Sequence, residues 1–290
     1  MTAGEPQQTW RVIDLINWGT DYFAKKNFEN PRREIEWLLS DFLNCKRIDL
    51  YLRFDELFSR PMLNQFRAWV KRRVNHEPLQ YISGRAEFYG LTFQVNRNVL
   101  IPRPETERLV EVVLELIGGD TAPRILEVGT GSGCIAVTLA KELPESQILT
   151  IDNSPAALDL ARSNTFDNDV ANIEFRLMDF LLETPETKFD FVVSNPPYIP
   201  QTEKNTLTPE VIKYEPESAL TDDQDGLQFY HRFRDTAPGL IEPGGWLVLE
   251  TGLGNHPQLA AAIFATEKFL SVELIKDYNK DDRVLKVQVK

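Results

Sequence analysis

The sequence predicts an α/β protein with a largely parallel sheet covered by helices and a smaller helical domain before it. Strand-like and helix-like segments alternate from residue 124 onward, which is typical of a parallel sheet. The first 80 or so residues show only the spacing of amphipathic helices. The last two strand-like runs must form a hairpin, because a parallel crossover needs about a dozen residues or more.

Length and composition favour two domains in a reducing compartment. The chain has 290 residues, against roughly 100 to 200 for one domain. Hydrophobic residues make up 42% and charged residues 26%, which allows a core without disulfides. There is no signal-peptide pattern, no apolar run of about 18 residues, and only two cysteines. We therefore expect a cytoplasmic protein without membrane contact and, as the simplest state, a monomer.

The charge distribution argues against nucleic acid as a direct partner. The net charge is −12, yet residues 1–90 carry 14 Lys and Arg against 12 Asp and Glu, so the rest of the chain is strongly acidic. Phosphate contacts supply most non-specific affinity for nucleic acids, and an acidic body opposes them. The three histidines lack the spacing of metal ligands, and we expect no metal site.

Two apolar stripes recur at helical spacing in the N-terminal part. They comprise Ile35, Leu38, Leu39 and Phe42, and then Leu63, Phe66, Trp69, Val70 and Val74. Asn30 is expected to cap the first helix through its side chain, before Pro31 at the first helical position. Four basic residues fall largely on the other face of the second stripe: Arg67, Lys71, Arg72 and Arg73. They form either a solvated face or a surface that docks a partner.

Residues 88–101 change to a strand-like period, with turn candidates at Gly90 and at residues 96–98. We place the connection between the domains here. A helix is expected from about residue 105 to 117, ended by Gly118 and Gly119. Strands are then expected at 124–128, 147–151, 173–177, 189–194 and 246–250, with the closing hairpin at 270–275 and 283–289. Helices are expected after Ser132, Ser154, Gln228 and His256.

A glycine-rich turn follows the first strand of the sheet. Gly129, Gly131 and Gly133 follow the apolar run I-L-E-V, and glycines there let a ligand approach the backbone at the carboxyl end of the sheet. The order G-x-G-x-G differs from the dinucleotide fingerprint G-x-G-x-x-G. Glu127 places a carboxylate beside the loop, which repels phosphate but suits the cationic amino-acid half of S-adenosylmethionine. A purely structural carboxylate is the alternative.

Three residues after the next two strands complete the expected cofactor site. Asp152 ends the second strand, where it can accept hydrogen bonds from ribose hydroxyls. Asp179 and Phe180 follow the third strand, where a carboxylate can bind adenine and a ring can stack on it. Ordinary core packing is the alternative for Phe180. Cys134 is interpreted as a small helix residue and not as a nucleophile.

The fourth strand leads into Asn195-Pro196-Pro197-Tyr198. Two prolines fix the backbone and remove two donors, which leaves carbonyls free as acceptors. The Asn195 side-chain oxygen and the Pro196 carbonyl can hold the two N–H bonds of a planar NH2 group, while Tyr198 packs on its face. The motif selects a planar NH2 but leaves adenine N6, cytosine N4 and glutamine N5 open. A rigid turn without catalytic function is the alternative.

The sequence resembles the HemK-type release-factor glutamine methyltransferases over essentially its whole length. The resemblance rests on motifs at 77–82 (E-P-L-Q-Y-I), 87–93 (E-F-Y-G-L-T-F), 101–107 (I-P-R-P-E-T-E), 127–133 (E-V-G-T-G-S-G), 195–199 (N-P-P-Y-I), 215–220 (E-P-E-S-A-L), 225–230 (D-G-L-Q-F-Y) and 250–252 (E-T-G). It implies a class I S-adenosylmethionine-dependent methyltransferase with a Rossmann-like, seven-stranded mixed sheet. It also implies methylation of the glutamine N5 in the Gly-Gly-Gln motif of peptide-chain release factors.

The resemblance further implies a helical substrate-docking domain at 1–83, a β-hairpin linker at 84–101 and a methyltransferase domain at 102–290. It assigns Gly129, Thr130, Gly131, Ser132, Gly133, Asp152 and Phe180 to the cofactor, Pro196, Pro197 and Tyr198 to the glutamine amide, and Asn195 to both. One departure is visible: relatives often show D-x-x-G-x-x-R near the C-terminus, and here Lys280 replaces the glycine between Asp277 and Arg283. This puts the local turn geometry in doubt.

Two rival classes share parts of this pattern. An amino-methyltransferase acting on a DNA or RNA base also uses Asn-Pro-Pro-Tyr, but it must flip its base out of a duplex and normally adds a basic groove or recognition region. Neither feature is evident. A non-catalytic binding module that kept the fold is disfavoured by the intact Asn195 and glycine turn.

Overall fold

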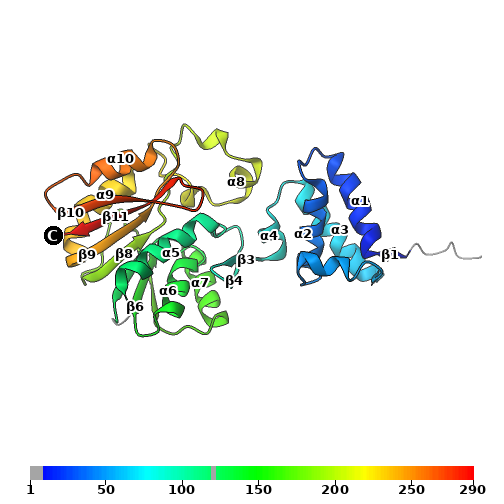
Figure 1. Ribbon diagram of the computed structural model, residues 1–290, viewed down its shortest axis with the longest axis horizontal. Coiled ribbons are helices and arrows are strands. Elements are labelled where there is room, and N and C mark those ends of the chain that lie inside the picture. The colour runs from blue at the N-terminus through cyan, green and yellow to red at the C-terminus, as the bar shows by residue number, and fades with distance from the viewer. Residues whose placement is uncertain (1–8, 119–121) are drawn as a thin grey trace, which may run out of the picture. The chain divides into compact units, whose positions relative to one another are not determined.

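A computed structural model describes residues 9–118 and 122–290 of the chain, shown in Figure 1. Gly119, expected to help end a helix, lies outside the described residues, as do residues 1–8. The chain divides into two compact units, Met1–Ser83 and Gly84–Lys290. None of the helices described in these ranges is long and apolar enough to cross a membrane.

The first unit is helical, with one short pair of strands that the sequence does not predict. Its helices are α1 (Val12–Ala24), α2 (Pro31–Phe42), the 3-10 helix η1 (Arg47–Tyr51), α3 (Arg60–Val74) and α4 (Leu79–Ser83). Strands β1 (Trp10–Arg11) and β2 (Leu57–Phe58) pair antiparallel. Both predicted apolar stripes pack into one core, where Ile35, Leu38 and Phe66 are fully buried.

Two details of the first unit differ from expectation. Asn30 is the N-cap residue of α2 and Pro31 opens the helix, but the Asn30 side chain makes no capping hydrogen bond. Arg73 is not on the solvated face of α3, since it is 7% exposed and forms an ion pair with Glu34 at 2.7 Å. Helix α3 therefore keeps only part of the expected basic stripe at its surface.

The second unit is an α/β sandwich around a seven-stranded mixed sheet, which confirms the predicted fold class. Its strands are β5 (Arg124–Val128), β6 (Gln147–Asp152), β7 (Ile173–Leu177), β8 (Phe189–Ser194), β9 (Ile241–Glu250), β10 (Phe269–Lys276) and β11 (Asp282–Val289). Their order is β10-β11-β9-β8-β5-β6-β7. Strands β5 to β9 pair parallel, and β11 pairs antiparallel with both β9 and β10.

Helices cover both faces of the sheet (Figure 1). The longer ones are α5 (Pro104–Ile117), α6 (Cys134–Glu142), α7 (Pro155–Asp167), α9 (Gln228–Leu240) and α10 (His256–Ile263). Successive strand residues point to opposite faces. Leu126 accordingly joins the core beneath α9 and α10, whereas its neighbour Ile125 joins the core beneath α5 and α6. Two separate apolar cores thus hold the sheet between helix layers.

The remaining elements lie before the sheet and between β8 and α9. They are β3 (Arg85–Phe88), β4 (Leu91–Gln94), the 3-10 helices η2 (Lys204–Thr206) and η3 (Glu217–Ala219), and the short helix α8 (Pro209–Tyr214). Strands β3 and β4 form a hairpin over 85–94, so the strand-like run stops before residue 101. Its Phe88 and Phe93 are buried in the core beneath α5 and α6. Strand β9 begins at Ile241, five residues earlier than predicted.

The turn of the closing hairpin keeps its shape although glycine is absent. Asp277 Oδ1 accepts hydrogen bonds from the backbone N–H groups of Asn279 and Asp281, at 2.8 and 3.1 Å. Lys280 occupies the left-handed region, with φ of +71°. Because an L side chain is strained there and glycine is not, the turn retains its conformation at an energetic cost.

We expect Lys280→Gly to raise the free energy of unfolding by about 1 kcal/mol, because it removes left-handed strain of roughly 1 to 2 kcal/mol against a smaller entropic loss. Urea unfolding measures this. Lys268→Gly is the control, since Lys268 is also an exposed turn lysine but has no positive φ. It should lower stability slightly, and equal effects of the two substitutions would contradict the strain assigned to Lys280.

Candidate active site

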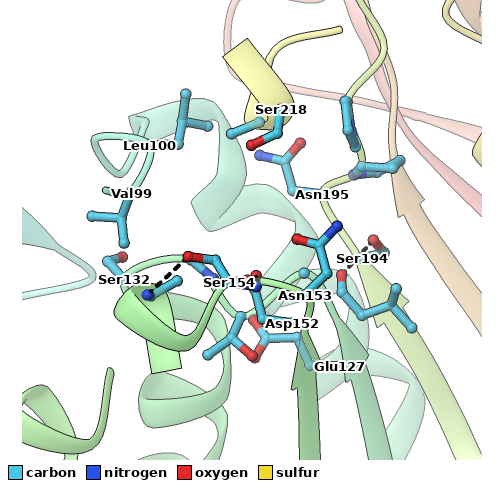
Figure 2. A pocket seen from close by; sticks show the side chains of 18 of the residues that line it. Val99, Leu100, Glu127, Ser132, Asp152, Asn153, Ser154, Ser194, Asn195 and Ser218 are labelled. Carbon is cyan, nitrogen blue, oxygen red and sulfur yellow. Dashed lines mark hydrogen bonds between the residues drawn. The ribbon is translucent and has the colours of Figure 1, made fainter. Parts of the chain in front are cut away.

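The predicted site residues meet at a pocket of about 310 Å³ at the carboxyl ends of β5, β6 and β8 (Figure 2). This is where open α/β sheets bind ligands. Of the residues predicted from the sequence, the lining includes Glu127, Gly129, Thr130, Gly131, Ser132, Asp152, Asp179, Phe180, Asn195, Pro196 and Pro197. Gly133 and Tyr198 are not part of it. The pocket thus joins the glycine turn to the start of the Asn-Pro-Pro-Tyr segment.

The glycine turn is held from the second strand. The backbone N–H groups of Gly129 and Thr130 donate to the Ile151 carbonyl, and Gly131 N donates to Asp152 Oδ2 at 2.9 Å. Gly133 has φ of +81°, and a Cβ placed on it would lie 3.0 Å from the Ala161 Cβ of α7. The third glycine therefore allows close packing of loop against helix instead of lining the pocket.

One buried amide fixes the turn from behind. Asn164 of α7 is fully buried, and its Nδ2 donates to the carbonyls of Ser132 and Gln94, at 2.8 and 3.0 Å. Its Oδ1 accepts from the backbone N–H of Gln94 at 2.6 Å. Asn164 thereby connects the glycine turn, α7 and the β3–β4 hairpin.

Asp152 at the end of β6, and Asp179 and Phe180 after β7, lie at the pocket and also make contacts within the protein. Asp152 Oδ1 accepts from Ser154 N at 2.8 Å, and Asp179 Oδ1 accepts from Leu181 N at 2.9 Å. Phe180 is 3% exposed and packs against Phe233, with ring centroids 4.7 Å apart. Each carboxylate still has lone pairs for a ligand, while the Phe180 ring belongs to both the core and the pocket wall.

Glu127 is a buried carboxylate with one unused oxygen. It is 1% exposed, and its Oε2 accepts from the Thr150 hydroxyl, which in turn lies 2.7 Å from the Thr130 hydroxyl. Its Oε1 has no hydrogen-bond partner among the described residues. Burial raises the pKa of Glu127 to about 8, with Asp152 adding to the rise. A buried, unpaired acceptor at a pocket is a costly feature that a cationic ligand would satisfy.

The Asn195 amide has a defined orientation. Its Nδ2 donates to the Thr106 hydroxyl of α5 at 3.2 Å, which leaves Oδ1 without a hydrogen-bond partner in the described part of the chain. The Pro196 carbonyl accepts no hydrogen bond from any described residue. Figure 2 shows Asn195 beside Ser218, across the pocket from the end of β6. Both acceptors assigned from the sequence are therefore available.

Tyr198 faces a different set of partners. Its hydroxyl donates to Glu250 Oε1 at 3.2 Å, and its ring lies 5.8 Å from the His256 ring. Burial raises the pKa of the Tyr198 hydroxyl well above its ordinary value. His256 Nδ1 accepts from Gly252 N, so its Nε2 donates to the Gly226 carbonyl, and burial lowers its pKa. Tyr198 therefore connects the end of the Asn-Pro-Pro-Tyr segment to β9 and does not line the pocket.

Several residues at the site have no role in the sequence interpretation. Thr106 and Glu250 contact Asn195 and Tyr198 from behind, and Arg103 forms an ion pair with buried Glu215 at 2.5 Å. All four lie in motifs that carry the family resemblance, I-P-R-P-E-T-E, E-P-E-S-A-L and E-T-G. The motifs therefore marked these residues, but their local sequence did not indicate what they contact. Cys134 lines the pocket, and burial raises its pKa to about 12, as expected for an unreactive thiol. No group of three His, Cys, Asp or Glu in the described ranges could hold a metal ion.

Comparison with known proteins agrees with this geometry. Residues 14–84 match the PrmC N-terminal domain, and residues 106–223 match the methyltransferase small domain. A methyltransferase structure from Pyrococcus furiosus superposes with a TM-score of 0.52 at 18% identity, covering 69% of this chain and 90% of that one. The fold and the domain matches define a methyltransferase.

Two curated relatives are more specific. The release factor glutamine methyltransferase of Geobacter sulfurreducens is 40% identical over 97% of this chain and 98% of its own length. That of Chlorobaculum tepidum is 40% identical over 96% of this chain and 97% of its own length. The chain belongs to the family of release factor glutamine methyltransferases, which confirms the resemblance seen in its motifs.

We expect the ligand-free protein to lose stability through Glu127 as pH rises from about 4.5 to 8. The folded pKa of about 8 lies above the ordinary value of 4.5, so the folded state holds a proton there that the unfolded state has lost. The slope is at most about 1.4 kcal/mol per pH unit. In urea unfolding at pH 5 to 8, the free energy of unfolding of Glu127→Gln should rise relative to that of wild type as pH rises. Parallel curves would refute the shift, since other acids cancel in the comparison.

Proposed function

We propose that the chain transfers the methyl group of S-adenosylmethionine to the side-chain N5 of the glutamine in the Gly-Gly-Gln motif of peptide-chain release factors. The observation that carries this is the Asn195 amide: Thr106 engages its nitrogen, and its oxygen remains available in the pocket that the glycine turn lines. The names of the curated relatives, release factor glutamine methyltransferases at 40% identity, support this substrate class.

The residues present fit the methyl donor. S-adenosylmethionine, when bound, supplies an electrophilic methyl group on a sulfonium sulfur. Glu127 Oε1 is a buried, unpaired acceptor suited to the ammonium of its amino-acid half. Asp152 would accept hydrogen bonds from the ribose hydroxyls. The Asp179 carboxylate would accept from adenine, and the Phe180 ring would offer it an apolar surface. Gly129, Thr130, Gly131 and Ser132 bring the backbone close to the ligand.

Asn195 and Pro196 would orient the glutamine nitrogen. An amide nitrogen is a poor nucleophile, because its lone pair is delocalised into the carbonyl group. If the Asn195 side-chain oxygen and the Pro196 carbonyl accept its two N–H bonds, the lone pair is directed out of the amide plane toward the methyl group. The nitrogen becomes acidic only after alkylation, so the site needs no base before attack. Pro197 keeps the acceptors rigid, and Tyr198 holds the segment from behind.

The remaining assignments concern domains and location. We infer that residues 1–83 dock the protein substrate, that 84–101 connect the domains and that 102–290 carry catalysis. We further infer a cytoplasmic monomer that acts without direct nucleic-acid contact, consistent with the acidic composition of its larger part.

Purified chain with labelled S-adenosylmethionine should label a release factor and leave plasmid DNA and RNA unlabelled. Asn195→Ala should lower kcat about 100- to 1000-fold, the typical effect of removing one transition-state hydrogen bond, with little change in cofactor affinity. Asn153→Ala, another Asn at the pocket but after β6, is the matched comparison and should retain more activity. Label entering only nucleic acid would refute the substrate, and normal turnover by Asn195→Ala would refute the acceptor.

For docking, we expect reversal of two exposed residues of the basic stripe on α3, Arg67→Glu with Lys71→Glu, to raise KM for a whole release factor several-fold. KM for a short Gly-Gly-Gln peptide and the cofactor affinity should stay the same, because neither involves the helical domain. Lys25→Glu with Lys26→Glu, an equally exposed pair after α1, is the control. Unchanged KM for the whole release factor would show that this surface does not dock it.

A further inference from the structure

Glu250 is a buried carboxylate at the carboxyl end of β9 to which the proposed reaction assigns no role. It is 1% exposed, and its strand is the next neighbour of β8, which leads into Asn195. A carboxylate without solvent is costly unless donors surround it. Its partners therefore indicate what it does.

The first partner is Tyr198, whose hydroxyl donates to Glu250 Oε1 at 3.2 Å. This bond ties the end of the Asn-Pro-Pro-Tyr segment to β9. The segment has little freedom at this point, because a Cβ on Gly226 would lie 2.3 Å from the Tyr198 carbonyl oxygen. The backbone after the two prolines is thus fixed from both sides.

A second neighbour is Thr106, whose hydroxyl accepts a hydrogen bond from Asn195 Nδ2 at 3.2 Å. Glu250 Oε2 has no hydrogen-bond partner within the described residues, and Thr106 is the neighbour that lowers the pKa of Glu250 most strongly. The Thr106 hydroxyl is therefore the donor available to this oxygen. A hydroxyl whose proton points to a carboxylate presents only lone pairs elsewhere. Asn195 must then face Thr106 with its nitrogen and the pocket with its oxygen.

The end of β9 is itself rigid. Tyr230 donates to the Glu250 backbone carbonyl at 2.6 Å, and Arg283 donates to the next carbonyl, that of Thr251, at 3.1 Å. Arg283 is held in turn by Asp277 of the closing turn, with Nε and Oδ2 3.5 Å apart. The carboxylate is therefore placed by three elements: β9, α9 and the C-terminal hairpin.

We propose that Glu250 is a positioning residue whose carboxylate sets the orientation of the Asn195 amide through Thr106 and fixes Tyr198 directly. Glu250 touches neither substrate nor cofactor in this role. The inference rests on the proposed function, since the orientation matters only if the Asn195 oxygen accepts from an amide NH2. A protonated or amidated side chain could not accept from both hydroxyls, and Asn195 would then lose its fixed orientation.

The charge state of Glu250 gives this role a pH signature. The titratable groups facing it are Glu105 of α5, Cys134 of α6, Tyr198, Tyr230 of α9 and Arg283 of β11. Burial raises its pKa to about 7, although Thr106, Arg283 and Tyr198 oppose the rise. The proposed role requires the ionised form, which can accept from both hydroxyls, so kcat should fall as pH drops through about 7.

The test compares Glu250→Gln with Glu242→Gln, a half-buried glutamate at the other end of the same strand that pairs with Arg124. Label transfer to a release factor is measured from pH 6 to 9, with cofactor affinity by calorimetry. Glu250→Gln should lower kcat about 10- to 100-fold, the effect of a misplaced catalytic group, with cofactor affinity within about twofold and the pH-dependent limb lost. Glu242→Gln should match wild type. If Glu250→Gln retains kcat or the limb, the proposal is overturned.

Thr106→Val tests the proposal a second time, and it remains a test if Glu250→Gln does not fold. It removes the hydroxyl at nearly constant shape and should also lower kcat at least about tenfold. Combined with Glu250→Gln, the loss should be smaller than the product of the single losses, because both act on one chain of contacts. Wild-type kcat in Thr106→Val, or fully multiplicative losses, would overturn the proposal. A wild-type chain that labels no release factor would instead refute the proposed function, and the inference with it.

Discussion

The pairing of β5 with β8 is the interaction on which the site depends. Val128 and Ser194 are register partners at the ends of the two strands, and the Ser194 hydroxyl donates to the Val128 carbonyl at 2.6 Å. The glycine turn follows one strand and Asn195 follows the other, so two segments more than 60 residues apart leave the sheet side by side. Parallel strands bring their carboxyl ends to one edge, and here that edge holds both the cofactor-binding loop and the acceptor segment.

Around that edge the protein buries two carboxylates that form no ion pair within the described residues. Glu127 and Glu250 are each 1% exposed, and each keeps one oxygen without a hydrogen bond in the described part of the chain. Burial raises the pKa of both. This energetic cost is typical of functional sites, where a desolvated charge becomes favourable only when the right partner arrives. Glu127 lines the pocket, and Glu250 accepts from Tyr198 at the end of the segment whose first three residues line it.

Local patterns in the sequence predicted most of the fold and the location of the pocket. Strand and helix periodicity, the glycine turn and the proline pair are properties of consecutive residues, and they placed β5 to β8 within one residue. Several misses came from partners far away in sequence. Arg73 is buried because Glu34 meets it, and the relation of Glu250 to Tyr198 and Thr106 spans 52 and 144 positions. Periodicity carries no information about such pairs. The contact of Gly133 with α7 is likewise invisible in the sequence.

The Asn164 amide has a mechanical consequence. One side chain makes three hydrogen bonds, two to β4 and one to the loop that cradles the pocket. The loop and β4 cannot move independently, because a shift of either one would break buried hydrogen bonds to Asn164 that no water can replace. A ligand that orders the loop should therefore also restrict the motion of the hairpin, which lies more than thirty residues earlier in the chain.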